Sequence, residues 1–519
     1  MRVINRAIIF FNQRQYLWYL LLFALAFSLF AYLQLDPTFA DPDSFYHAKM
    51  AQVLRDQGVV TEFPWLSATT LRYDYTDHHL LYHILLIPFV SILPPLVGLK
   101  LATIFFASLF VVLFFWLLRS LKVKGALWYA LFLLTVNPFI FRLNLAKAQA
   151  VVLILLFLAL YFLFNRRYLS LLFASWLYVW LYAGWPLLLV LSSVYLLVNW
   201  FIYQRQGGWL IIQRIRHKAN GQSLFLLFSV ILGLAAGVFF SPYFPRNLYF
   251  YWQQTFKIAL VNYQSVIGVG GEWYPFSFSQ LLLGALPFFI VFIAALTLFI
   301  YYRKKQTVYS WTFLIFSLLF FILTLKSRRN IEYFVPFALV FSGLVITNLS
   351  VWPAKFLAKL KLVNLSWALP LILFLLFSSI FIRDLMLVKD SYRQGFSFTK
   401  FSQPANWLKE NTPPGSIVFH SDWDEFPLLF YHNSHNRYLV GLDPTFMYTY
   451  DQDLHQSWVE ITTGKSNQNL QPMIKNVFGA DYVFVDFNSN AEFDRNLANN
   501  IFFQKVFENQ EARVYKVIE

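Results

Sequence analysis

Long apolar segments alternate with short polar segments along the first three quarters of the chain. A membrane-spanning helix needs about 20 mainly apolar residues. The pattern predicts eleven such helices, at residues 16–35, 97–118, 125–141, 148–164, 168–183, 186–203, 223–240, 280–302, 309–325, 332–350 and 364–382. Residues 80–95 are also apolar but contain Pro88, Pro94 and Pro95, so we interpret them as a re-entrant or interfacial segment.

The last part of the chain, residues 384–519, is polar and has shorter patterns. A helix, turn and strand within residues 404–422 are followed by strand-like runs at 437–442, 481–486 and 512–517, which alternate with helix-like runs. This alternation is typical of a small α/β domain. The sequence therefore predicts a polytopic α-helical membrane domain over residues 1–383, with about eleven transmembrane helices, followed by an α/β domain over residues 384–519.

The composition supports a membrane protein. Hydrophobic residues make up 58% of the chain and charged residues 13%, whereas a soluble domain carries roughly 25% charged residues. The net charge of +15 would suggest a nucleic-acid partner in a soluble protein. Here it indicates basic cytoplasmic loops, and we expect no nucleic acid. The chain has no cysteine, which excludes disulfides and thiolate chemistry.

The basic residues predict an orientation, because cytoplasmic loops are enriched in Lys and Arg. Every second polar segment is basic, and these residues are Arg2, Arg6, Arg14, Arg119, Lys122, Lys124, Arg166, Arg167, Arg205, Arg214, Arg216, His217, Lys218, Arg303, Lys304, Lys305, Lys355, Lys359 and Lys361. The N-terminus is then cytoplasmic. Residues 36–96, 241–279 and 384–519 are extracytoplasmic, where a reaction needs a donor available outside, such as a lipid-linked one.

Two of the expected outer segments carry carboxylates in candidate site positions. Asp41-Pro42-Asp43 offers two carboxylates that suit Mg²⁺ or Mn²⁺, and Asp43 is also a candidate general base. The alternative is that Asp43 only caps the helix that follows it. Glu272 stands in Gly-Val-Gly-Gly-Glu-Trp-Tyr-Pro, and its alternative is an ordinary solvated loop acid.

Cations also occur in the outer segments, against the rule for cytoplasmic loops. Arg142 and Lys147 lie between the third and fourth expected helices, and Arg328 and Arg329 lie between the ninth and tenth. Such groups either reach toward lipid headgroups or bind an anion. Their recurrence opposite an acidic segment favours a bound phosphate or pyrophosphate.

Four segments, in order along the chain, resemble a known family: ADPDSFYHAKMAQVLRDQG, SVIGVGGEWYP, SRRNIEYFVPFALVF and HSDWDEFPLLFYHN. Together they are similar to the GT-C glycosyltransferases, and most similar to the catalytic subunit of oligosaccharyltransferases. The resemblance implies catalytic roles for Asp43, Asp41 and Glu272, with Asp43 and Glu272 as ligands of a Mg²⁺ or Mn²⁺ ion. It implies donor-phosphate binding by Arg328 or Arg329, with Arg142 near them, and from the residues themselves we expect Arg142 and Lys147 to bind the donor phosphate too. We expect acceptor binding by His47, Tyr46, His78, His79, Trp423 and Asp424.

The resemblance implies an extracytoplasmic transferase that moves a sugar or oligosaccharide from a polyprenyl phosphate or pyrophosphate to a protein, glycan or lipid acceptor. Its partners would be the lipid-linked donor, the acceptor and membrane lipids. Two alternatives stay open: a transporter or flippase of lipid-linked glycans, and a non-catalytic glycan-assembly protein. The few charged residues within the apolar segments argue against ion-coupled transport.

Three departures from the family pattern bear on this expectation. The family's second acidic pair is replaced by Arg142-Leu-Asn-Leu-Ala-Lys147-Ala-Gln149, which has no carboxylate. A metal ion would lose ligands there, and Lys147 would supply fixed positive charge instead. The acceptor segment has one Trp, at position 423, and no Gly, and eleven helices are fewer than the thirteen of that subunit.

Overall fold

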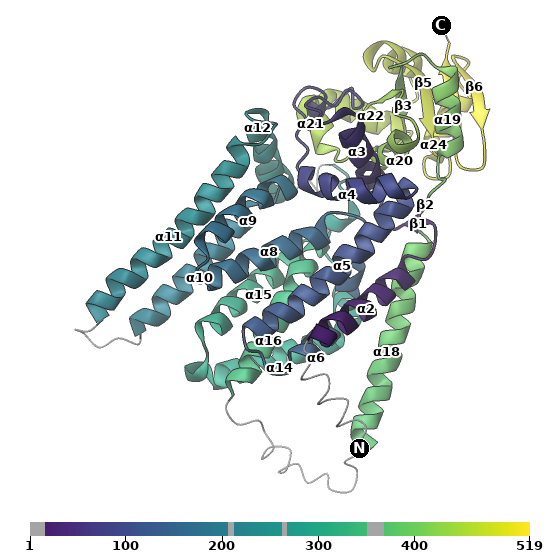
Figure 1. Cartoon of the computed structure of the whole chain (residues 1–519). Helices are drawn as coiled ribbons and strands as arrows, with labels where there is room; N and C mark the ends of the chain where they lie inside the picture. Colours follow the sequence, from purple (N-terminus) through teal and green to yellow (C-terminus); the bar gives the residue numbers. More distant parts are fainter. Residues whose placement is uncertain (1–15, 206–211, 262–266, 350–367, 519) are drawn as a thin grey trace.

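The computed structural model describes residues 16–205, 212–261, 267–349 and 368–518. Arg2, Arg6, Arg14, Lys355, Lys359 and Lys361, the start of the eleventh expected helix and the first two residues of SVIGVGGEWYP lie outside the described residues. A body of long helices forms one part of the molecule, and all seven described strands belong to or adjoin the other part (Figure 1).

Every expected apolar segment coincides with helix in the described residues. Nine are continuous: α2 (Tyr16–Leu33), α5 (Pro95–Ser120), α8 (Gln149–Phe164), α9 (Tyr168–Leu181), α10 (Pro186–Arg205), α11 (Ile212–Phe239), α15 (Val308–Lys326), α16 (Ile331–Asn348) and α18 (Ala368–Arg393). Residues 80–95 are helical too, as α4 (Leu80–Ile92) and the start of α5. Helix α4 keeps Pro88 in its interior and packs between α3 (Asp43–Gln57) and α5.

The other two expected segments are each bent into a pair of helices. Helices α6 (Ala126–Leu133) and α7 (Asn137–Leu143) meet at 76°, and α13 (Phe278–Gly284) and α14 (Leu286–Tyr301) meet at 85°. Pro138 and Pro287 stand in the first turns of α7 and α14. A proline is tolerated there and cannot continue the preceding helix, since it lacks the backbone N–H.

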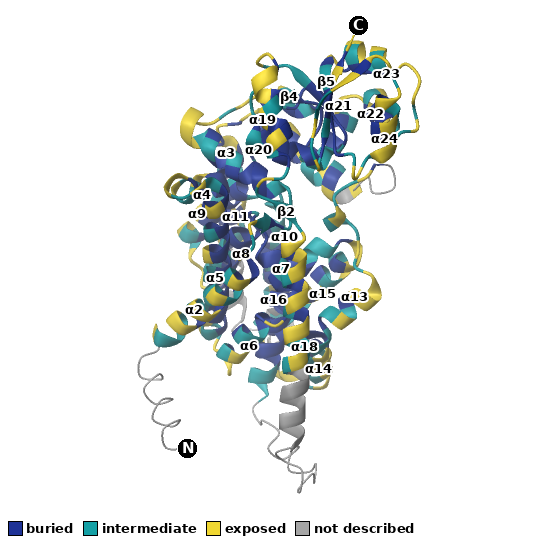
Figure 2. Cartoon of the chain, turned by 90° about the vertical axis from the view of Figure 1, so that its right-hand side faces the viewer, coloured by how far each residue is buried: buried dark blue, intermediate teal, exposed yellow. Residues whose placement is uncertain are grey.

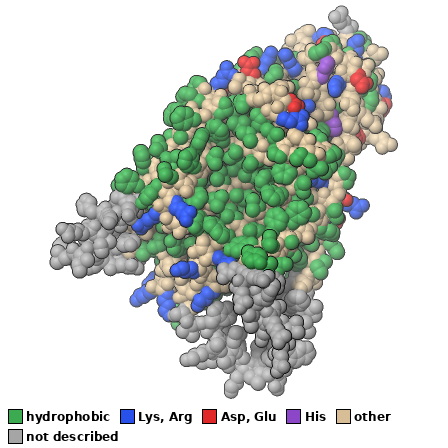
Figure 3. Space-filling view, viewed as in Figure 1, with side chains coloured by type: hydrophobic (Ala, Val, Ile, Leu, Met, Phe, Trp, Pro, Cys, Tyr) green, Lys and Arg blue, Asp and Glu red, His purple; other side chains and the backbone are tan. Residues whose placement is uncertain are grey.

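Apolar side chains cover the middle of the helical body. Figure 3 shows them across its central surface, with Lys and Arg side chains at its lower end. Among the described residues, four helices are long and apolar enough to cross a membrane, or up to six if each bent pair counts as one span. These observations fit a membrane protein, and the number of eleven spans stays a prediction.

The described strands of the second part form a mixed sheet. Its order is β4 (Arg437–Tyr438), β3 (Ile417–His420), β5 (Ala480–Val485), β7 (Arg513–Val517) and β6 (Phe503–Glu508). Strand β3 pairs in parallel with β4 and β5, whereas β7 is antiparallel to β5 and β6. The helices of this part are α19 (Ser402–Asn411), α20 (Phe426–His432), α21 (Thr445–Tyr450), α22 (Gln452–Thr462), α23 (Leu470–Pro472) and α24 (Ala491–Ala498).

The sheet-containing part is joined to the helical body through the segment that follows α2. Strand β1 (Thr38–Phe39) pairs with β2 (Phe396–Ser397), directly after α18. Further on, the backbone of residues 65–68 hydrogen-bonds to Tyr438 and Leu439, at the edge of the sheet. Buried hydrophobic residues continue across this junction (Figure 2). Helix α18 itself runs past residue 383, and the division of the chain into two domains at that point stays a prediction.

Short helical segments complete the connections between these elements. They are η1 (Thr70–Arg72), α12 (Arg246–Trp252), η2 (Gln253–Val261), η3 (Gly271–Trp273), η4 (Arg303–Lys305), η5 (Arg328–Asn330), η6 (Trp423–Glu425) and η7 (Met473–Val477). Of these, η3 and η5 pack against each other. This contact brings Glu272 next to the cations of η5.

Candidate functional site

Lys147 is the meeting point of three carboxylates from two distant segments. Its Nζ atom lies 2.7 Å from Asp41 Oδ2 and 2.9 Å from Asp43 Oδ2. Glu272 Oε2 is 3.9 Å away, within ion-pair range but beyond a hydrogen bond. The Lys147 side chain is 10% exposed, and the three carboxylates are 20–27% exposed. The acidic residues expected from the sequence are therefore brought together, around an ammonium group.

Arg142 joins Glu272 to a fourth carboxylate, Glu332 of α16. Its Nη1 donates to Glu272 Oε2 over 2.6 Å, while Nη2 and Nε donate to Glu332 Oε2 over 3.1 and 3.3 Å. Arg142 and Glu332 are both buried. Because the guanidinium is hydrogen-bonded on two sides by carboxylates, it orients Glu272 toward Lys147.

The two arginines of η5 have different environments. Arg328 donates through its side chain to the backbone carbonyls of Tyr274 and Pro275, over 3.2 Å each, and so fixes the segment that carries Glu272. Among the described residues, the polar contacts of Arg329 are long, 3.6 Å to Glu272 Oε1 and 3.5 Å to the Tyr182 hydroxyl. Its guanidinium also lies 4.2 Å from the centre of the Trp273 ring.

Local folding explains how these groups are held. Helix α3 starts at Asp43, whose backbone N–H donates to Asp41 Oδ1 over 3.0 Å, so Pro42 and this bond fix the two carboxylates relative to each other. Lys147 lies in the turn between α7 and α8. Gln34, just after α2, donates to the carbonyl of Asn144 in that turn over 2.7 Å.

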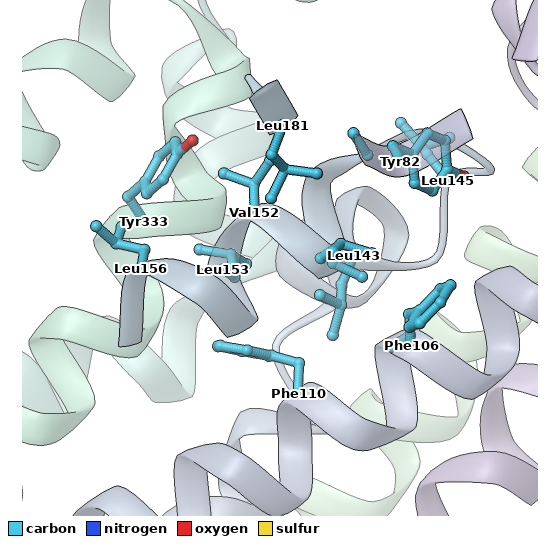
Figure 4. Close-up of a cluster of buried hydrophobic side chains, with 14 of the residues drawn as sticks. Tyr82, Phe106, Phe110, Leu143, Leu145, Val152, Leu153, Leu156, Leu181 and Tyr333 are labelled. Atoms are coloured by element: carbon cyan, nitrogen blue, oxygen red, sulfur yellow. The ribbon is translucent and has the colours of Figure 1, made fainter. Parts of the chain in front are cut away.

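Hydrophobic packing supports the same turn from below. Leu143 and Leu145 belong to a cluster of buried side chains that also includes Phe110 of α5 and Val152 of α8 (Figure 4). Buried apolar side chains of this kind are close-packed and rigid on average. The ammonium of Lys147 is thus presented from a fixed backbone.

The charges change the titration of the groups in the site. Burial raises the pKa of Asp43 to about 6, with Asp41 and Glu272 adding to the rise and Lys147 opposing it. Burial also disfavours the charged form of Lys147, but Asp41, Asp43 and Glu272 together raise its pKa above the ordinary value. For Glu272 the effect of burial is outweighed by Lys147, Arg142 and Arg329, which hold its pKa well below the usual range. Lys147 and Glu272 are therefore charged at neutral pH.

Trp423 and Asp424 reach the site from the sheet-containing part. The Trp423 ring lies next to Gly270, two residues before Glu272, with 3.6 Å between its edge and the point where a Cβ would stand. Burial raises the pKa of Asp424 to about 8, together with the negative charges of Asp422, Asp43 and Asp41. The expected acceptor segment therefore faces the acidic cluster.

The other four expected acceptor residues lie where α3 packs on α4, with Tyr46 and His47 buried and His78 and His79 partly buried. His47 Nδ1 and His83 Nε2 are 2.8 Å apart, and His83 Nδ1 is 2.7 Å from Asp77 Oδ2. The hydroxyls of Tyr46 and Tyr75 are 2.6 Å apart. His79 Nδ1 donates to the Leu181 carbonyl over 3.0 Å, and the His78 ring packs against Phe250. These contacts hold α3 on α4 and the start of α4 on α9, and an acceptor role for Tyr46, His47, His78 and His79 stays a prediction.

The expected Mg²⁺ or Mn²⁺ ion does not fit the residues at this point. An ion held by Asp43 and Glu272 would lie between their carboxylates, at metal–oxygen distances of about 2.0–2.6 Å. The Lys147 ammonium occupies that position, because it lies against both Asp41 and Asp43. In the part of the chain that the structure describes, no group of three or more His, Cys, Asp or Glu is placed to hold a metal ion.

No family model matches the sequence, and no curated protein matches it. Solved structures do match. The archaeal oligosaccharyltransferase AglB from Archaeoglobus fulgidus, in complex with an inhibitory peptide and a dolichol-phosphate, is 13% identical with a TM-score of 0.60 over 94% of this chain and 71% of AglB. ArnT from Cupriavidus metallidurans, bound to undecaprenyl phosphate, is 13% identical with a TM-score of 0.56 over 96% of this chain and 97% of ArnT.

A third match is the arabinofuranosyltransferase AftD from Mycobacteria, 12% identical with a TM-score of 0.55 over 97% of this chain and 40% of AftD. All three are GT-C glycosyltransferases. The chain has the GT-C fold. The expectation from the four sequence segments is confirmed at this level, and the GT-C fold includes both the helical body and the sheet-containing part, since the matches span 94–97% of the chain.

Glu332 is the site residue that the sequence analysis missed. It stands in the quoted segment SRRNIEYFVPFALVF, within an apolar run. A carboxylate at the start of a predicted transmembrane helix is costly unless it is paired. That cost was the available signal, and Arg142 is the partner that offsets it.

We predict that Glu332→Gln destabilises the protein by about 3 kcal/mol, because breaking a buried ion pair leaves Arg142 undercompensated. The measurement is unfolding in detergent, monitored by circular dichroism during a denaturant titration. Glu410→Gln, an exposed acid of α19, is the matched control and should change nothing. Adding Arg142→Gln to Glu332→Gln should cost less than the sum of the single changes, and strict additivity would contradict the pairing.

Proposed function

We propose that this protein is a glycosyltransferase that acts on the extracytoplasmic side of a membrane. It would move a sugar or oligosaccharide from a polyprenyl phosphate or pyrophosphate to a protein, glycan or lipid acceptor. The observation that carries the proposal is the convergence of Asp41, Asp43, Glu272 and Arg329 beside Trp423, within a GT-C fold. The neighbours AglB and ArnT were solved with dolichol-phosphate and undecaprenyl phosphate.

The membrane arrangement belongs to the same proposal. All eleven apolar segments cross the bilayer, with the N-terminus cytoplasmic and residues 384–519 as an extracytoplasmic domain. The charge pattern of the loops supports this arrangement. The site then lies at the extracytoplasmic membrane surface, where the headgroup of a lipid-linked donor would be presented.

In the proposed reaction the acceptor attacks the anomeric carbon of the donor directly. A bond forms between the acceptor atom and that carbon while the bond from the carbon to the phosphate oxygen breaks, and its electron pair leaves with the lipid phosphate. The Asp43 carboxylate orients the acceptor and takes its proton. Its raised pKa, about 6, suits a general base better than that of an ordinary aspartate.

The positive groups would stabilise the negative charge that develops on the leaving phosphate. Arg142 is hydrogen-bonded to two carboxylates and Arg328 to two backbone carbonyls, so they shape the site. Arg329 makes only long contacts and is the arginine best suited to bind the donor phosphate. Trp423 and Asp424 would contact the acceptor from above.

We predict that purified wild-type protein releases polyprenyl phosphate or pyrophosphate from extracted polyprenyl-linked saccharides. Mass spectrometry measures the released lipid. Asp43→Asn should lower the rate at least about 100-fold, because it removes the general base. Asp56→Asn is the matched control, since Asp56 lies on the same helix, is exposed and pairs only with Arg55. Stoichiometric donor binding without release, in the presence of acceptor extracts, would favour a carrier instead.

Arg329→Gln should raise the KM for the donor by about 10- to 100-fold, the loss expected for one hydrogen bond to a charged group. Arg328→Gln should mainly lower the thermal stability of the protein, because Arg328 holds backbone carbonyls. Steady-state kinetics and thermal unfolding in detergent check both variants. A larger KM effect from Arg328→Gln than from Arg329→Gln would refute the assignment.

The rate should fall as the pH is lowered through about 6, because Asp43 must be ionised to accept a proton and its pKa lies there. Asp41→Asn removes a neighbouring negative charge and should move the midpoint of the profile to lower pH. The measurement is kcat/KM against pH for both proteins. A midpoint that stays fixed, or moves upward, in Asp41→Asn would show that another group titrates.

A further inference from the structure

We infer that the Lys147 ammonium is the permanent cation of this site and replaces a divalent metal ion there. The inference rests on the proposed function for its chemical meaning. It starts from the donor set: Asp41 and Asp43 in the segment after α2, and Glu272 in the segment before α13, point their carboxylates at one position. Converging carboxylates from separate segments are the usual ligand set of a hard divalent cation.

The atom at that position is Lys147 Nζ. It is 2.7 Å and 2.9 Å from the two aspartates, which are the distances of charge-assisted hydrogen bonds. A magnesium ion needs oxygen ligands at about 2.0–2.1 Å and retains several waters. Neither the ion nor its waters can share the space with the ammonium, and the two charges would repel each other.

Displacing the Lys147 ammonium from this position is also unfavourable in free energy. Its turn is fixed by Gln34 and by the hydrophobic cluster of Leu143 and Leu145. Moving a 10% exposed ammonium away would leave Asp41 and Asp43 facing each other without a partner. Two neighbouring carboxylates without a cation between them repel each other, so this displacement is unfavourable.

An ammonium has three N–H donors, and two of them are directed at Asp41 and Asp43. The third carboxylate, Glu272, is too distant at 3.9 Å for a hydrogen bond. The third donor is therefore available to a substrate oxygen. Lys147 would hold the Asp43 carboxylate and contact a donor phosphate oxygen at the same time, the bridging role that a metal ion performs in phosphoryl-transfer enzymes.

The experiment has a kinetic arm and a binding arm. In the kinetic arm, donor release by the metal-stripped wild type should be the same, within about twofold, in excess EDTA and with added Mn²⁺. Lys147→Gln should lose about 100-fold or more, and Lys147→Arg, which keeps the charge, should retain more activity than Lys147→Gln. Loss of wild-type activity in EDTA that Mn²⁺ restores would overturn the inference while leaving the proposed function intact.

The binding arm does not depend on activity, so it decides the inference even if no donor turnover is found. Mn²⁺ is titrated into wild type and Asp43→Asn, and bound ion is detected by electron paramagnetic resonance. We expect wild type to bind no more Mn²⁺ than Asp43→Asn does at millimolar Mn²⁺. Stoichiometric Mn²⁺ binding to wild type that Asp43→Asn abolishes would overturn it.

Discussion

Pairing of buried charges is the constraint on which the arrangement of this site depends. Lys147 and Arg142 are almost fully removed from solvent, and each is offset by carboxylates far away in sequence. Burying an unpaired charge costs several kcal/mol. The segments after α2, between α7 and α8, before α13 and at the start of α16 must therefore fold together, because each supplies the partner that another segment lacks.

This constraint separates groups that build the site from groups that remain available. Arg142 and Arg328 have their donors directed at protein acceptors, and they fix Glu272 and the backbone around it. Arg329, with only long polar contacts and an aromatic ring beneath it, retains its capacity for an external anion. Similar residue types in neighbouring positions thus have different roles, which only the contacts distinguish.

Local patterns predicted a large part of this molecule. Apolar runs located the helices, and Pro138 and Pro287, inside two expected spans, explain where those spans bend. The convergence on Lys147 could not be predicted in the same way, because it joins residues more than 100 positions apart and leaves no periodic signal. Glu332 is one carboxylate in an apolar run, and its partner Arg142 lies 190 positions away in the sequence, so the pair becomes visible only in the folded chain.

A fixed ammonium and an exchangeable metal ion make different demands on a fold. A metal ion brings its charge from solution, so the protein has only to supply ligands. An ammonium must be placed by the chain, which explains why the turn around Lys147 is anchored both by Gln34 and by buried leucines. The charge is then preorganised without any dependence on ion concentration, and preorganised charge is the larger part of most enzymatic stabilisation. In the proposed reaction one ammonium would not clamp a phosphate through several bonds, and we propose Arg329, on the other side of Glu272, as the second cation.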